Sequence, residues 1–305
     1  MRLWLDGVAK PVCPLPLGEN SLYVAYYASA EMSCHLALDW NLPDNLLDLF
    51  CEFRCQNNGL SLPVKNNLLG ALSLHGLEHI SLVEKEEMRE LAMRGGPYSP
   101  EEQVALLDYC QADVDALVAL LPEMAPKISI DHALIRGRYM KAVARMESVG
   151  IPVDLPLLDR LQANWESIQD ELISVVDQDF GVYEGRTFKT DLFAQYLNRN
   201  QIAWPKLPSG NLDLREDTLR SMAKSYPQIS SLHELRHSLG SMRLNKFKVG
   251  TDGRNRTLLS PFRSKTSRNQ PSTSKFIFGP SKWLRSLIKS AEGYGIPYVD
   301  WFQLE

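Results

Sequence analysis

The sequence predicts a mixed fold in which a small α/β unit is followed by a mainly α-helical chain. The apolar run Leu22–Tyr27 is typical of a short strand and stands among helical patterns. Further along, residues 156–180 carry apolar side chains at helical spacing, and residues 251–290 are expected to be mostly loop. With 305 residues, of which 44% are hydrophobic, the chain is long enough for two or three domains.

Helical patterns account for most of the N-terminal part. The strongest one begins with Ser99 at the N-cap, Pro100 at the first helical position and two acids in the first turn, and it is expected to run to about Leu121. Other helices are predicted at Ala30–Leu38, Pro43–Phe53, Lys65–Leu77 and Glu84–Met93.

The second half is predicted to be helical as well, except at its end. Helices are expected at Ile130–Val149, Pro156–Phe180, Thr190–Asn200, Arg215–Lys224, Leu232–Lys248 and Ser281–Ile288. The run Ile296–Val299 is interpreted as a short buried strand that delivers the carboxylate of Asp300 to its carboxyl end.

Charge is distributed unevenly along the chain. Residues 231–290 contain thirteen Lys or Arg and two acids, a net charge of +11, so the remainder carries −15 to give the total of −4. A basic arm on an acidic body is typical of a surface that binds a polyanion, most often nucleic acid. No apolar stretch reaches 18 residues and no secretion signal is recognisable, and an odd number of five cysteines suits a reducing cytoplasm.

The last residues sharpen the expectation of a nucleic-acid partner. Asp300, Gln303 and Glu305 form an Asp-x-x-Gln-x-Glu pattern after an apolar run. This pattern resembles the first palm motif of the family A DNA polymerases, the bacterial DNA polymerase I group, although Phe302 stands where that family has Ser. The resemblance implies that Asp300 holds catalytic Mg²⁺ ions and that Glu305 packs under the incoming sugar.

Two upstream segments resemble the same family in the expected order. Thr266-Ser267-Arg268 stands where the family has Thr-Gly-Arg, and residues 145–154 resemble its Met-Glu-x-x-Gly-Ile-x-Val-Asp segment. That segment also reads as a helix stopped by Gly150 and followed by an extended stretch. The basic residues expected to contact DNA are Arg236, Arg243, Lys246, Lys248, Arg254, Arg256, Arg263, Lys265 and Arg268.

The resemblance covers most of the chain, weakly before about residue 95, and implies three domains. Residues 1–128 would form an N-terminally incomplete, RNase H-like exonuclease domain. Residues 129–250 would form a helical linker and thumb. Residues 251–305 would form a basic DNA-contact segment and the first palm strand, where the pattern is truncated.

An exonuclease motif is recognisable but incomplete. Tyr109 and Asp113 fit the family's Tyr-x-x-x-Asp motif, in which Tyr orients the attacking water and Asp binds a metal, and the i, i+4 spacing places both on one helical face. Two-metal hydrolysis needs several converging carboxylates. The family's Asp-x-Glu motif is missing, and only Glu31 and Asp48 could add carboxylates. No proofreading activity is therefore predicted.

The sequence also leaves a zinc alternative open. Cys51, Cys55, His75 and His79 could form a four-ligand set, but the spacer is longer than in the common zinc finger. Packing cysteines at helical spacing and surface histidines explain the same residues.

The first expectation is therefore a cytoplasmic fragment of a family A, phage-like DNA polymerase that binds a DNA primer-template and is inactive alone. Mg²⁺ is its implied cofactor, at Asp300 and Asp113. Deoxynucleotide triphosphates are expected as ligands only if a second polypeptide supplies the missing palm and fingers. The alternatives are a non-catalytic DNA-binding module and a metal-dependent 3′–5′ exonuclease.

Overall fold

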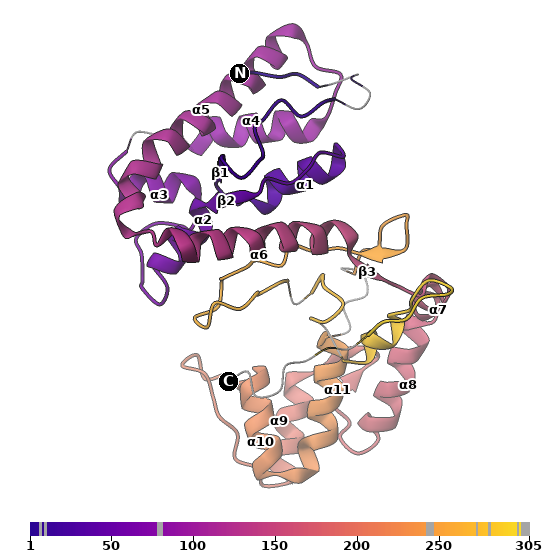
Figure 1. The fold of residues 1–305 in the computed structure, drawn as a ribbon. Coiled ribbons are helices and arrows are strands. Elements are labelled where there is room, and N and C mark those ends of the chain that lie inside the picture. The colour runs from indigo at the N-terminus through magenta and orange to yellow at the C-terminus, as the bar shows by residue number, and fades with distance from the viewer. Residues whose placement is uncertain are drawn as a thin grey trace. The chain divides into compact units, whose positions relative to one another are not determined.

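The computed structural model describes all residues except 6–7, 9–10, 78–81, 242–246, 273, 280–281, 298 and 300–305. Helices dominate, and the chain forms two compact units (Figure 1). Unit 1 comprises Met1–Val149 together with Leu258–Pro271, and unit 2 comprises Gly150–Thr257 together with Ser272–Glu305. The first boundary between the units follows Val149, because the long helix that ends there packs within unit 1.

Unit 1 is built on a parallel strand pair. Strand β1 (Leu22–Ala25) pairs in register with β2 (Asn45–Asp48), and helix α1 (Ser29–Ala37) connects them. The predicted helix over Pro43–Phe53 is wrong in its first half, because residues 45–48 form β2. Helix α2 (Leu49–Gln56) begins only after Asp48, whose side chain caps it.

The remaining helices of unit 1 follow the sequence pattern closely. They are α3 (Leu68–Leu74), α4 (Leu82–Arg94), α5 (Pro100–Met124), the 3₁₀ turn η1 (Ala125–Lys127) and α6 (Ile130–Val149). Ser99 and Glu102 form a reciprocal capping box that fixes the start of α5. Pro122 lies inside the helix, so α5 ends at Met124, slightly later than predicted.

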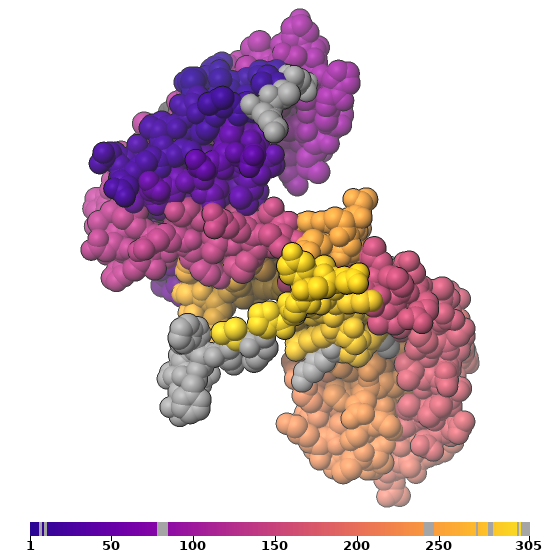
Figure 2. Space-filling view, turned by 45° about the vertical axis from the view of Figure 1, so that its right-hand side comes forward, coloured from indigo at the N-terminus to yellow at the C-terminus, as the bar shows by residue number. Residues whose placement is uncertain are grey.

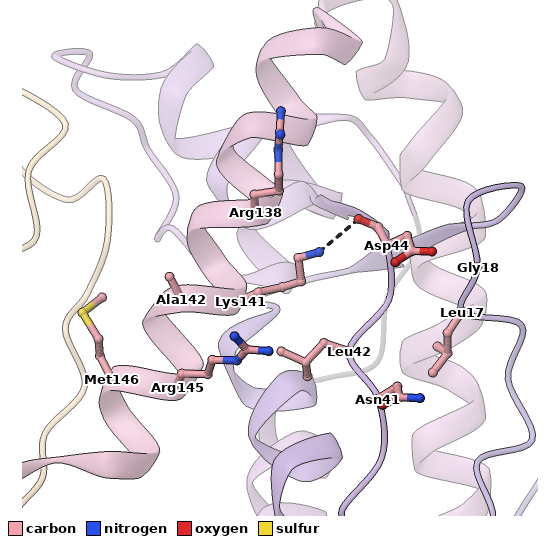
Figure 3. A pocket seen from close by; sticks show the side chains of 10 residues that line it. All are labelled: Leu17, Gly18, Asn41, Leu42, Asp44, Arg138, Lys141, Ala142, Arg145 and Met146. Atoms are coloured by element: carbon pink, nitrogen blue, oxygen red, sulfur yellow. Dashed lines mark hydrogen bonds between the residues drawn. The ribbon is translucent and has the colours of Figure 1, made fainter.

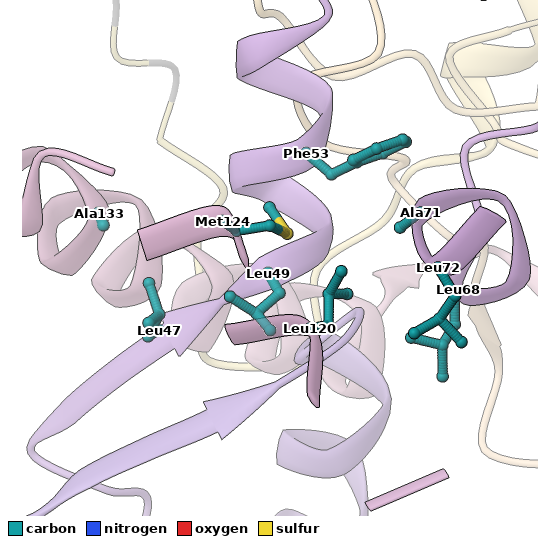
Figure 4. Close-up of a cluster of buried hydrophobic side chains, with 9 residues drawn as sticks. All are labelled: Leu47, Leu49, Phe53, Leu68, Ala71, Leu72, Leu120, Met124 and Ala133. Carbon is teal, nitrogen blue, oxygen red and sulfur yellow. The ribbon is translucent and has the colours of Figure 1, made fainter. Parts of the chain in front are cut away.

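Helix α6 packs directly on β2 around a buried core (Figure 4). The core side chains come from β2, α2, α3, α5 and α6, namely Leu47, Leu49, Phe53, Leu68, Ala71, Leu72, Leu120, Met124 and Ala133. The close approach depends on Gly137, because a Cβ there would lie 1.8 Å from the carbonyl oxygen of Leu46. This contact fixes α6 against the sheet.

Unit 2 consists of short helices and two-residue strands. Its helices are α7 (Leu155–Ala163), α8 (Trp165–Asp177), α9 (Thr190–Arg199), α10 (Glu216–Ser225) and α11 (Ser230–Ser241), with 3₁₀ turns η2 (Pro227–Ile229) and η4 (Lys282–Leu287). Strand β3 (Ile151–Pro152) pairs with β6 (Arg254–Asn255), and β4 (Tyr183–Glu184) pairs with β5 (Thr187–Phe188).

Three sequence-based expectations for unit 2 need correction. The predicted helix over 156–180 is interrupted at Asn164, which separates α7 from α8 and whose side-chain amide and backbone amide both donate to the carbonyl of Arg160. The helix expected at Ser281–Ile288 is the 3₁₀ turn η4. The helix expected over Leu232–Lys248 ends as α11 at Ser241, and residues 242–246 lie outside the described part.

The described residues of the predicted palm strand, 296, 297 and 299, do not form a strand, and residues 298 and 300 lie outside the described part. Ile296 and Val299 are 54% and 79% exposed. No strand pairs with these three residues within the described chain, and an apolar run needs such a ladder to be buried as a strand.

Among the helices that the structure describes, none is both long and apolar enough to cross a membrane.

Candidate nucleic-acid interface

Segment 258–271 of unit 1, here called the basic segment, carries three cations and no acids. Side chains from three elements hold its backbone. Glu147 of α6 accepts from the amide of Leu259 at 2.6 Å, and Arg54 of α2 donates to the carbonyl of Pro261 at 2.7 Å. Asn58 donates to the carbonyl of Lys265 at 2.8 Å. Figures 1 and 2 show the orange segment lying along α6.

This anchoring leaves the cations of the basic segment facing solvent. Arg263, Lys265 and Arg268 are all exposed, and none forms an ion pair with a residue that the structure describes. The turn that presents them is closed by a hydrogen bond from the Arg268 amide to Ser264 Oγ, at 2.8 Å. Ser267 has a φ of 58°, in the left-handed region that favours glycine, and it occupies the position where the polymerase motif has Gly.

A polar cavity of about 580 Å³ lies beside these cations. Arg54, Arg263 and Lys265 line it together with asparagine side chains from residues 57–66. Burial, aided by the nearby charge of Arg263, lowers the pKa of the Arg54 guanidinium, whose Nε atom is buried without a hydrogen-bond partner. Three cations around one cavity favour an anionic ligand.

The other predicted DNA-contact residues belong to unit 2 and differ in how they are engaged. Lys248 is exposed, whereas Arg256 forms a two-point ion pair with Asp252 at 2.8 and 2.5 Å. Arg254 lies in β6. The guanidinium of Arg236 lies 4.0 Å from the ring centroid of Phe188 and so contributes to packing. Arg243 and Lys246 lie outside the described residues.

Tyr109 and Asp113, the pair that resembles an exonuclease motif, lie together, but Lys85 forms an ion pair with Asp113. Tyr109 and Asp113 lie on the same face of α5, as the spacing predicted, and Lys85 of α4 contacts both. Lys85 Nζ is 3.1 Å from Asp113 Oδ1 and 5.7 Å from the centroid of the Tyr109 ring. Burial and the charge of Asp113 raise the pKa of Tyr109 to about 12. The ammonium group thus neutralises the carboxylate that a metal would need.

The two other candidate carboxylates have structural environments. Asp48 is 1% exposed and accepts hydrogen bonds from the amides of Tyr27, Ala28 and Phe50 at 2.9–3.0 Å, so its oxygens are occupied. Burial, aided by the charges of Asp48 and Asp113, raises the pKa of Glu31 to about 7. A partly protonated carboxyl is a poor ligand for a hard cation.

These residues therefore do not fit Mg²⁺. Within the described residues, no three His, Cys, Asp or Glu side chains are arranged to hold a metal. The thiol of Cys51 donates to Asp48 Oδ2 at 3.4 Å, while His79 of the zinc alternative is not described. The polymerase-type residues Asp300 and Glu305 also lie outside the described part, so their geometry stays a prediction.

Sequence reasoning missed two groups of residues. Lys85 sits in a helix recognised only as charged, and no local pattern indicated that it would meet Asp113, 28 positions away. His233 and His237, spaced as His-x-x-x-His on α11, both contact Glu216 Oε1, at 2.9 and 3.1 Å. The i, i+4 spacing could have predicted that they share a face. This cluster joins α10 to α11.

Comparisons with known proteins give a fold relationship. No family model matches the chain, and no curated protein matches its sequence. Among solved structures, the chain resembles the POL domain of Pol1 from M. smegmatis, determined in complex with DNA primer-template and dNTP. The TM-score is 0.55 at 17% identity, over 90% of this chain and 46% of that one. The chain thus has a fold similar to part of a DNA polymerase domain and spans less than half of that domain's length.

Proposed function

We propose that this chain binds DNA as part of a family A polymerase-like module, with a primer-template duplex as its ligand. The observation that carries the proposal is the anchored basic segment, which presents Arg263, Lys265 and Arg268 without ion-pair partners among the described residues. The polymerase-like fold and the motif at Asp300, Gln303 and Glu305 support the same assignment.

Phosphate recognition explains why these three cations matter. Arg guanidinium groups bind phosphate oxygens through two parallel hydrogen bonds, and Lys adds a compact charge. Each phosphate that is neutralised releases condensed counterions from the duplex, so affinity falls steeply as salt rises. Because Arg54, Asn58 and Glu147 hold the backbone of the segment, little ordering is needed when DNA binds.

The proposal for these 305 residues is DNA binding rather than nucleotide addition. Two-metal phosphoryl transfer requires several carboxylates and groups that grip the triphosphate. By resemblance, Asp300 and Glu305 supply one part of that constellation. Nucleotide addition, with Mg²⁺ at Asp300, would require the remaining palm carboxylate and the fingers in addition to these residues.

The test is the salt dependence of duplex binding. A fluorescein-labelled primer-template is titrated with the protein at several salt concentrations, and anisotropy gives Kd. The triple variant Arg263→Gln, Lys265→Gln, Arg268→Gln is expected to reduce the slope of log K against log[salt] by about two to three, close to 0.9 per lost phosphate contact.

The control removes the same charge from other exposed positions. A triple variant of Lys127, Arg199 and Lys224 to Gln also lowers the net charge by three, and its slope should stay near that of the wild type. If the slope fell equally in the two triple variants, net charge alone would explain the effect, and the proposed interface would be contradicted.

A further inference from the structure

A second cationic surface of unit 1 lies on helix α6, apart from the residues that hold the basic segment. Arg138, Lys141 and Arg145 follow one another at i, i+3 and i+7, so they form a single stripe along the helix. With a rise of about 1.5 Å per residue, the two arginines are separated by about 10.5 Å along the axis. Both are exposed, and neither forms an ion pair with a described residue.

This stripe forms one wall of a pocket of about 910 Å³ (Figure 3). Lys141 and Arg145 point from α6 toward the loop of Leu42 and Asp44, and Arg138 lies about one turn away at the end of the stripe. Leu17 and Leu42 face the helix from the opposite wall, and Met146 is a further lining residue on α6 itself. The pocket therefore combines cationic groups with an apolar surface.

Lys141 has a structural role that fixes the pocket. Its ammonium group donates to the carbonyl oxygens of Pro43 at 2.7 Å and Asp44 at 3.0 Å, which ties the loop after α1 to α6. Burial lowers the pKa of Lys141, the charges of Arg138 and Arg145 lower it further, and Asp44 opposes them. One acid against three cations leaves the pocket with an excess of positive charge.

We propose that this pocket binds a single strand of nucleic acid, with Arg138 and Arg145 on its phosphodiesters and the bases against Leu17 and Leu42. The choice of DNA as the strand rests on the DNA binding proposed above. A strand can place separate phosphates on the two arginines, because its flexible backbone carries a phosphate at every nucleotide. The apolar wall provides a surface for bases, which duplex DNA keeps stacked.

The test uses the whole chain and a fluorescein-labelled dT12 oligonucleotide. The variant Arg138→Gln, Arg145→Gln is compared with a charge-matched control, Lys127→Gln, Arg199→Gln. We expect the first variant to weaken dT12 binding at least tenfold and to lower the salt slope by about 1.4, close to 0.7 for each of two single-strand phosphates. The control should change affinity less than twofold, and duplex binding should stay within twofold in both.

Cross-linking locates the bound strand independently of affinity. A dT12 oligonucleotide that carries 5-iododeoxyuridine is irradiated with the protein, and the modified peptides are identified by mass spectrometry. Cross-links in residues 10–20 or 138–149 support the pocket. Cross-links confined to residues 258–271 would overturn it while leaving the duplex proposal intact. An equal loss of dT12 binding in the control variant would also overturn it.

A competition experiment separates a strand from a free nucleotide. The protein with bound dT12 is titrated with dTTP. If dTTP bound tightly and displaced dT12 at concentrations near the Kd of dTTP, the ligand of the pocket would be a nucleotide and the strand proposal would fail. A wild-type protein that does not bind the duplex, but binds dT12 more tightly than the Arg138→Gln, Arg145→Gln variant does, would contradict the proposed function and support the single-strand pocket.

Discussion

Acidic and basic side chains of unit 1 meet opposite environments. The carboxylates that a nuclease would use are engaged, because backbone amides surround Asp48 and Lys85 neutralises Asp113. The cations of the basic segment instead reach solvent from an anchored backbone. In unit 1, therefore, the charged side chains that are available to bind a ligand are those that have no partner within the described residues.

Two arginines of α6 show the same contrast over a distance of two residues. Arg136 forms two hydrogen bonds, both of 2.6 Å, with Glu52 of α2, and the Glu52 side chain is only 3% exposed. Arg138 is exposed and lines the α6 pocket. Arg136 therefore joins α6 to α2, whereas Arg138, two residues later, lines a cavity.

The largest effect is expected from breaking the clamp. Arg136→Ala leaves the Glu52 carboxylate buried without its partner, which should lower the free energy of unfolding by about 3–5 kcal/mol. Arg138→Ala should change it by less than about 0.5 kcal/mol, because that side chain is exposed. Urea unfolding of both variants measures the difference. Similar stability losses in the two would erase the distinction between the arginines.

A smaller effect is expected from the buried acid Glu31. Its pKa of about 7 in the folded protein exceeds the ordinary 4.5, so the folded state binds more protons than the unfolded state between those pH values. The stability contributed by protonated Glu31 is complete below pH 4.5 and is lost as pH rises through 7. Glu31→Gln should remove that loss and raise stability at pH 8 by up to about 3 kcal/mol.

The check is urea unfolding of the wild type and Glu31→Gln at pH 5 and pH 8. The two proteins should be close in stability at pH 5 and diverge at pH 8. A pH-independent difference would mean that the Glu31 carboxyl is ionised throughout and accessible to a cation.

The smallest effect on stability is expected from the partly exposed ion pair between Lys85 and Asp113. The Lys85–Asp113 pair has side chains 27% and 36% exposed, so Asp113→Asn should cost about 0–1 kcal/mol. Thermal unfolding of the wild type should also be insensitive to millimolar Mg²⁺. A stabilisation by Mg²⁺ that Asp113→Asn abolishes would show that the ion displaces Lys85.

The sequence predicts elements best where local signals agree. The capping box at Ser99 and the periodic pattern of α6 specify their helices almost to the residue. The sequence predicts a helix where β2 forms, because the short segment Asn45–Asp48 becomes a strand only through its pairing with β1, more than 20 residues away. The interruption at Asn164 falls inside an apolar pattern that reads as one continuous helix.

The candidate site was only partly predictable for the same physical reason. The uneven charge and the motif residues identified Arg263, Lys265 and Arg268 as cations of interest. Their presentation depends on Arg54 and Asn58, both of which contact the basic segment across 207 positions. Lys85 likewise meets Asp113 only in the folded chain. Local patterns carry no information about such contacts.

One gel experiment tests the central contrast most directly. The protein is incubated with a 5′-labelled primer-template and Mg²⁺, and the samples are analysed on native and denaturing gels. We expect a retarded complex on the native gel and a primer of unchanged length on the denaturing gel. A primer that shortens with time, with the shortening abolished by Asp113→Asn, would contradict it, as would the absence of any complex at low salt.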